Sequence, residues 1–137
     1  MTDVAPKFGQ GYPGRPEDHN VVILGASAKP GRYANMAQRQ LMAQGYRVIP
    51  VHPKMKEIEG VPVVHTLRAI ADPVHTLTLY VGPHRSLPLI EDIIRLNPRR
   101  VIFNPGTESE LLQADLRRRH IAQVHGCTLV MLRTGQF

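Results

Sequence analysis

Five short apolar runs, each ended by glycine, proline or a polar residue, recur along the chain after residue 19. The clearest of them, such as Val21-Val22-Ile23-Leu24, are continuous stretches rather than an alternation of apolar and polar positions. Continuous runs rich in β-branched residues are typical of strands buried on both faces of a parallel sheet. Five strands are therefore predicted, at residues 21–24, 47–51, 76–81, 100–103 and, with a weaker pattern, 121–124.

Between these runs the hydrophobic positions change to helical spacing. Leu89, Ile90 and Ile93, for example, recur at intervals of three and four residues and would form an apolar stripe on one helix face. Gly45 is a suitable C-cap for a first helix, and Ser109 a suitable N-cap for a last one. Helices are predicted at residues 33–44, 87–96 and 109–119, with a lesser helical unit at 61–71.

The alternation of strands and helices predicts an α/β fold. We expect a Rossmann-like, doubly wound parallel sheet of about five strands in a single domain. Right-handed crossovers favour the strand order 3-2-1-4-5, numbered along the chain, with a crevice at the carboxyl ends of strands 1 and 4. Glycine and proline are frequent before residue 19, so residues 1–18 are predicted to form an irregular arm and residues 19–137 the domain.

The composition excludes several classes of protein. The 137 residues are 42% hydrophobic and 20% charged, which argues against a disordered chain or a coiled coil. No apolar run is long enough for a membrane helix, and the first residues lack the apolar stretch of a secretory signal. The single cysteine, Cys127, cannot form an internal disulfide. We therefore expect a cytoplasmic protein without a membrane partner.

The charge balance favours an anionic ligand. There are 17 Lys and Arg residues against 11 Asp and Glu, which gives a formal net charge of +6. Such an excess suits phosphates, nucleotides or nucleic acid. Four Tyr, three Phe and no Trp offer few aromatic platforms for unpaired bases, which argues against nucleic acid. The expected ligand is a small phosphate-bearing molecule, and a protein partner stays open.

The segment directly after the first strand is the best candidate for holding phosphate. It reads Gly25-Ala26-Ser27-Ala28-Lys29-Pro30-Gly31-Arg32. Small residues let a ligand approach the backbone, and N–H groups ahead of a helix suit an anion. Ser27 adds a hydroxyl donor, and Lys29 and Arg32 add positive charge. The Gly-Lys-Ser/Thr ending of a P-loop is missing, so ATP hydrolysis by that mechanism is excluded.

The end of the second strand narrows the choice of nucleotide. NAD-binding domains usually place Asp or Glu there to hold the ribose hydroxyls. Here the sequence reads Val51-His52-Pro53-Lys54, with no acid until Glu57. This argues against NAD and admits ligands with a phosphorylated ribose, namely NADP or coenzyme A (CoA).

Four segments at successive strand ends, taken together, resemble a known family: residues 25–27, 46–54, 78–81 and 104–108. The chain is similar to small stand-alone CoA-binding proteins, whose domain resembles the N-terminal part of the succinyl-CoA synthetase alpha subunit. The likeness covers residues 19–137, and it implies a Rossmann-like fold that binds CoA or an acyl-CoA.

The resemblance also implies a role for each strand-end loop, with Lys54 as the partner of the 3′-phosphate. The implied contacts are Gly25, Ala26, Ser27, Arg32 and Tyr33 at the pyrophosphate, His52, Pro53 and Lys54 at the adenosine end, Val81, Gly82 and Pro83 along the nucleotide or the start of the pantetheine arm, and Asn104, Pro105 and Gly106 further along that arm.

The sequence departs from the family in ways that bear on activity. One branch of the family ends with an acidic-Arg-Cys stretch, where this chain has Leu132-Arg133-Thr134. The phosphorylated histidine of the synthetase belongs to a further domain that the sequence does not match, so the resemblance implies binding rather than ligation. We therefore expect a non-catalytic, regulatory binding module. The alternatives are an NADP-binding domain acting with a separate catalytic chain and, third, a nucleotide enzyme with His84 as acid or base.

The other reactive side chains do not form a predicted site. His120, His125 and Cys127 are close in sequence but lack the further ligands and regular spacing of a zinc site, so no metal is expected. Cys127 is interpreted as a small core residue. A mixed disulfide with CoA stays an alternative, which would require an exposed thiol near the ligand.

Overall fold

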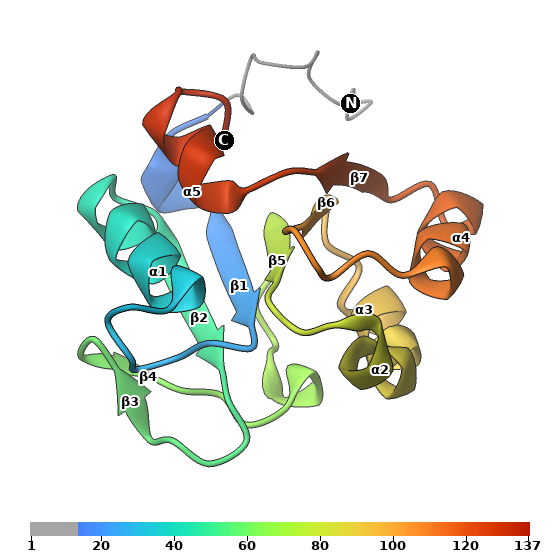
Figure 1. Cartoon of the computed structure of the whole chain (residues 1–137), viewed down its shortest axis with the longest axis horizontal. Coiled ribbons are helices and arrows are strands. Elements are labelled where there is room, and N and C mark those ends of the chain that lie inside the picture. The colour runs from blue at the N-terminus through green and yellow to red at the C-terminus, as the bar shows by residue number, and fades with distance from the viewer. Residues whose placement is uncertain (1–13) are drawn as a thin grey trace.

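The computed structural model of the protein describes residues 14–137. Five strands form one parallel sheet in the order β2-β1-β5-β6-β7 (Figure 1), and β3 and β4 form a separate antiparallel hairpin. The strands are β1 (Asn20–Leu24), β2 (Arg47–Val51), β3 (Glu57–Ile58), β4 (Val61–Pro62), β5 (Thr76–Leu79), β6 (Arg100–Phe103) and β7 (Ala122–His125). The predicted fold class, an α/β Rossmann-like parallel sheet of about five strands in one domain, is confirmed.

Helices cover both faces of the sheet. Figure 1 shows α1 and α5 on one face and α3 and α4 on the other. The α-helices are α1 (Tyr33–Ala43), α2 (Pro83–Ser86), α3 (Ile90–Leu96), α4 (Glu110–Arg118) and α5 (Thr128–Arg133), and the 3-10 turns are η1 (Pro16–Asp18), η2 (Leu67–Ala69) and η3 (Leu87–Leu89).

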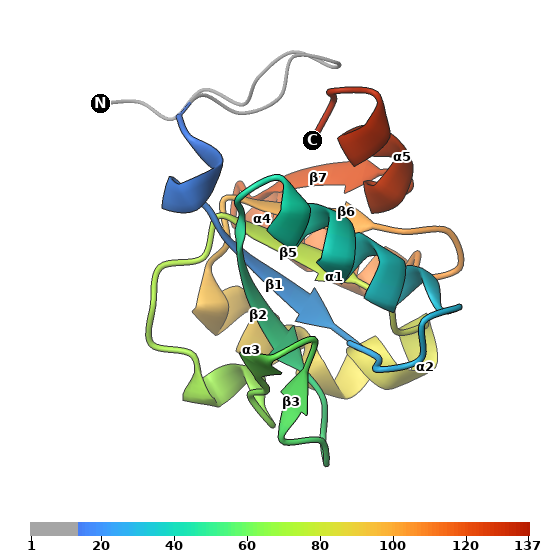
Figure 2. The same cartoon turned by 90° about the vertical axis from the view of Figure 1, so that its left-hand side faces the viewer.

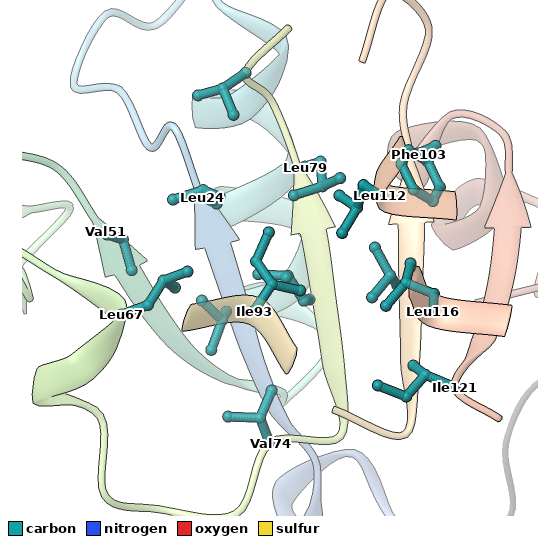
Figure 3. Packing of buried hydrophobic residues seen from close by; sticks show 14 residues of the cluster. Leu24, Val51, Leu67, Val74, Leu79, Ile93, Phe103, Leu112, Leu116 and Ile121 are labelled. Atoms are coloured by element: carbon teal, nitrogen blue, oxygen red, sulfur yellow. The ribbon is translucent and has the colours of Figure 1, made fainter. Parts of the chain in front are cut away.

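Alternate residues of the central strands divide the core into two layers. Val21 and Ile23 of β1 pack with α1 and α5. Val22 and Leu24 face the other way and join the layer under α3 and α4, which Figure 3 shows with Ile93 among its members. Because every residue of β5 and β6 is buried, these strands need a covered face on both sides. The continuous apolar runs in the sequence reflect this double burial.

The predicted strand order 3-2-1-4-5 is wrong. The third long strand, β5, lies between β1 and β6 instead of outside β2. Residues after β2 already occupy that outer edge: the Val64 N–H donates to the Pro50 carbonyl at 2.9 Å, and the His52 N–H donates to the Val64 carbonyl at 3.1 Å. The crevice therefore opens at the carboxyl ends of β1 and β5 rather than of strands 1 and 4.

The predicted helical unit at 61–71 is also wrong. Residues 61–62 form β4, and only Leu67–Ala69 makes a single 3-10 turn. Glu59 and Gly60 have φ values of +53° and +75°, which form a tight turn and reverse the chain into the β3–β4 hairpin at the edge of β2 (Figure 2). The other three predicted helices are confirmed as α1, η3 with α3, and α4, and Ser109 caps α4 by accepting the Leu112 N–H at 3.3 Å.

The predicted arm lies mostly outside the described residues, which exclude 1–13. Of its remaining part, Pro16–Asp18 forms η1. The domain boundary at residue 19 stays a prediction. In residues 14–137, no helix has the length and apolar character needed to cross a membrane.

Candidate functional site

The loop between β1 and α1, residues 25–32, crosses the end of β5 at close range. Gly25 has a φ of +92°, and a Cβ atom placed on it would lie 2.9 Å from Val81 Cγ1 and 3.1 Å from the Tyr80 carbonyl. A side chain at this position would therefore meet backbone that cannot move aside. The loop must begin with glycine to leave the sheet at the crevice.

Two cavities lie side by side at this crevice and share Gly25, Pro53 and Arg85 among their lining residues. The first, about 460 Å³, is here called the cationic lobe because Lys29, Arg32 and Arg85 line it. The second, about 480 Å³, is called the apolar lobe because it is walled mainly by hydrophobic side chains. These walls are Leu24, Val51, Leu67, Val81, Pro88 and Leu89.

The charges of the two lobes differ. Among the described residues that line the cationic lobe, none is acidic. The apolar lobe contains Asp92, but its carboxylate accepts a hydrogen bond from Arg68 Nε at 2.7 Å and is neutralised by that guanidinium. The lobe pair therefore presents uncompensated positive charge at one end and a hydrophobic surface at the other.

Side chains of α1 hold the loop from behind. Asn35 Nδ2 donates to the Ser27 carbonyl at 2.9 Å, and Arg39 Nη2 donates to the Pro30 carbonyl at 3.1 Å. The Ser27 hydroxyl accepts the Lys29 N–H at 3.1 Å, which tightens the turn between them. The loop conformation is thus fixed by the fold on the side away from the cavity.

The turn after β2 is held by a histidine ring. His52 Nδ1 accepts the backbone N–H groups of Lys54 and Met55 at 3.0 and 3.1 Å. Since Nδ1 is an acceptor, the proton of the neutral ring lies on Nε2. His52 and Pro53 line the cationic lobe, whereas the exposed Lys54 lines neither lobe.

Tyr80 lines the cationic lobe, and its hydroxyl is buried beside Thr78 and Thr128. Burial raises the pKa of Tyr80 to about 12, an effect that the nearby hydroxyls of Thr128 and Thr78 oppose. The phenol therefore keeps its proton at physiological pH and adds no negative charge to the lobe.

Arg85 is a charged residue of the site that was not among the predicted contacts. Gly82 is the N-cap of α2 and Pro83 its first residue, so this short helix brings His84 and Arg85 to the crevice. Arg85 lines both lobes. The Gly-Pro pair is a helix-start signal that would have placed Arg85 on a first helical turn rather than in a loop.

The structure brings together most of the predicted contacts at the first, second and third strand ends. Those that line a lobe are Gly25, Ala26, Ser27, Arg32, Tyr33, His52, Pro53 and Val81, and those that line neither are Lys54, Gly82, Pro83, Asn104, Pro105 and Gly106. Tyr33 is 65% exposed at the start of α1, so its ring is available at the rim.

The side chain of Asn104 forms hydrogen bonds within the fold. Its side chain is buried, and Nδ2 donates to Thr78 Oγ1 and to the Leu79 carbonyl, both at 2.7 Å. Its Oδ1 accepts the Thr128 N–H at 2.9 Å. The amide thereby joins β5, the end of β6 and the start of α5. Ligand contacts by Asn104, Pro105 and Gly106 stay predictions.

Cys127 is half-buried at the N-cap of α5 and lines neither lobe. Within residues 14–137, no three His, Cys, Asp or Glu side chains are grouped so that they could hold a metal ion.

Known proteins are similar to this chain in sequence and in fold. A crystal structure of an uncharacterized protein is 42% identical, with a TM-score of 0.82, and the match covers 87% of this chain and 98% of that one. The uncharacterized protein YneT of Bacillus subtilis is 30% identical over 95 residues, which are 69% of this chain. This chain spans only 57% of the length of YneT.

A larger enzyme contains the same fold. The dinucleotide forming acetyl-coenzyme A synthetase 1 of Ca. Korarchaeum cryptofilum, in complex with phosphate and ADP, matches with a TM-score of 0.62 and 23% identity, over 77% of this chain and 24% of that one. A likeness at this identity shows the fold alone.

The family model of the CoA-binding domain matches residues 19–133, nearly the whole of the described fold. The family expected from the strand-end motifs is thus confirmed: this chain belongs to the CoA-binding domain family.

Proposed function

We propose that the protein binds CoA or an acyl-CoA across the two lobes. The observation that carries this proposal is the joining of an acid-free cationic lobe to an apolar lobe at the carboxyl ends of β1 and β5. CoA has the same division, because its phosphates are strongly anionic and its adenine ring is flat and largely apolar. Membership of the CoA-binding domain family supports the choice of CoA.

The order of groups in CoA suggests how the ligand lies. The ribose, with its 3′-phosphate, connects the adenine to the pyrophosphate. With the adenine in the apolar lobe and the pyrophosphate against loop 25–27, Lys29 and Arg32, the ribose would lie where the lobes meet. Arg85 lines both lobes at that junction, so we assign the 3′-phosphate to Arg85 rather than to the exposed Lys54.

We further propose that the protein acts as a regulatory binding module without turnover of its own. His84 and Asp92 both line the apolar lobe, but the Asp92 carboxylate already pairs with Arg68. An acid or base at His84 would therefore lack this carboxylate as an orienting partner.

Calorimetric titration of the full chain with CoA, dephospho-CoA and NADP tests the proposal. We expect wild-type protein to bind CoA at least about tenfold more tightly than dephospho-CoA, the range for a charge-assisted phosphate contact. Arg85→Gln should abolish that preference, because the Arg85 guanidinium and the 3′-phosphate are the two partners of a single interaction. Once the guanidinium is removed, loss of the phosphate costs no further affinity. Lys54→Gln removes one equal charge nearby and should leave the preference intact.

Two results would contradict the proposal. Tight binding of NADP without binding of CoA would indicate the alternative, an NADP-binding domain that works with a separate catalytic chain. A CoA preference lost in Lys54→Gln but kept in Arg85→Gln would overturn the assignment of Arg85.

A further inference from the structure

The phosphate-facing loop is connected to the β3–β4 hairpin by a series of hydrogen bonds through α1. In Figure 1 the hairpin lies beneath the loop that leads from β1 into α1. Asn35, in the first turn of α1, donates from Nδ2 to the Ser27 carbonyl at 2.9 Å and to Glu59 Oε1 at 3.1 Å. Loop and hairpin therefore share one amide group, although Ser27 and Glu59 are far apart in sequence.

Asn35 is fully buried, and both hydrogens of its side-chain amide have a partner. Its Oδ1 accepts Arg39 Nε at 2.9 Å, and Arg39 Nη2 continues to the Pro30 carbonyl at 3.1 Å. Two loop carbonyls are thus held on the α1 side. In a planar trans peptide the following N–H points the opposite way, so the N–H groups of Ala28 and Gly31 are directed away from these side chains.

Glu59 occupies an unusual backbone conformation for its type. Its φ is +53° and that of Gly60 is +75°, and a turn with two such residues favours asparagine or glycine at the first of them. The hairpin can dock on α1 without the Glu59 side chain, because the buried Gln38 of α1 donates from Nε2 to the Ile58 carbonyl at 3.0 Å. The turn could form with asparagine or glycine in place of Glu59. The strained backbone of Glu59 therefore points to a role for its side chain.

We propose that Glu59 is a positioning residue for the ligand site. Its carboxylate occupies one Nδ2 hydrogen of Asn35 and so directs the other to the Ser27 carbonyl, which sets the orientation of the loop. Glu59 lines neither lobe and would act only through Asn35. This proposal rests on CoA binding to the cationic lobe, but the loop orientation itself is a property of the ligand-free protein.

Three variants separate this role from a general effect on stability. Glu59→Gly removes the carboxylate and relaxes the backbone, so we expect an unchanged or higher free energy of unfolding with CoA bound about threefold to tenfold more weakly, as for one lost hydrogen bond. Glu59→Gln keeps an acceptor at the same reach and should restore wild-type affinity. Glu57→Gln, on the same hairpin, removes the same charge and should change neither quantity.

Amide hydrogen exchange of loop residues 26–29 and 31 in the ligand-free protein is measured alongside calorimetry with CoA. Faster exchange in Glu59→Gly than in Glu59→Gln supports the positioning role even if wild-type protein fails to bind CoA, a result that would refute the proposed function alone. Equal loop exchange in the two variants, or wild-type CoA affinity in Glu59→Gly, would overturn the positioning role.

Discussion

His52 holds the turn that follows β2 by accepting two backbone N–H groups at Nδ1, those of Lys54 and Met55. The same arrangement, a side-chain acceptor bonded to N–H groups two and three residues later, is the usual role of Asn and Asp in turns. At the residue scale the cationic lobe thus depends on groups that fix the backbone: Gly25 at its crossing with Tyr80, the Asn35 amide behind the loop, and this ring.

We predict that His52→Ala lowers the free energy of unfolding by about 1 kcal/mol, because two N–H groups lose their acceptor. CoA affinity should fall with it, since the turn forms one wall of the cationic lobe. His52→Asn should stay within about 0.5 kcal/mol of wild type, because Oδ1 can accept the same groups. Urea denaturation measures both variants. If His52→Asn loses as much as His52→Ala, the ring itself, rather than its acceptor, holds the turn.

At the scale of the elements, the buried strands and the amphipathic helices were predictable, because each carries its own pattern. The runs at 21–24 and 100–103 mark doubly buried strands, and Ser109 marks the start of α4. The position of β5 was not predictable, because the strand order depends on which edge of β2 is free. The bridge formed by Val64, in a segment whose pattern predicted a helical unit, shows that the outer edge is taken.

The candidate site was likewise predictable only where its residues carry a sequence pattern of their own. The loop 25–32 and the end of β2 were predictable from small and polar residues directly after strands, and the lobes contain them. The walls from η2 and η3 were not predictable, because these short elements bring their side chains to the crevice only through packing across the sheet edge. Arg85 could have been found from the helix start at Gly82 and Pro83. Asn104 directly follows a strand, which is the position from which a ligand contact was predicted. Its side-chain amide joins β5 to α5 by hydrogen bonds.

At the scale of the whole molecule, buried basic groups gather at the edge of the sheet opposite the lobes. His75 stacks on His19 with ring centroids 3.9 Å apart, and its Nδ1 lies 2.8 Å from Thr76 Oγ1. Arg100 donates to the same threonine, and its guanidinium lies over the ring of Phe137. Burial, and then the neighbouring charges of His19, Arg100 and Arg99, lower the pKa of His75 to about 3.

The depressed pKa of His75 predicts acid-sensitive stability. Between pH 6.5 and about 3 the unfolded chain binds a proton at His75 that the folded protein does not bind, so the free energy of unfolding must fall as the pH falls. The contribution of this residue is at most about 1.4 kcal/mol per pH unit. Urea denaturation from pH 7 to pH 4 measures it, and His75→Gln should flatten the slope. An unchanged slope in the variant would assign the acid sensitivity to other groups.

A backbone chemical-shift map of the full chain titrated with CoA tests whether CoA lies across the cationic and apolar lobes. We expect the largest changes in residues 25–33 and 80–85, the two segments that face each other across the ends of β1 and β5. Largest changes at residues 104–108 and in α5, with the lobes unaffected, would refute binding across the lobes, as would a spectrum that CoA leaves unchanged.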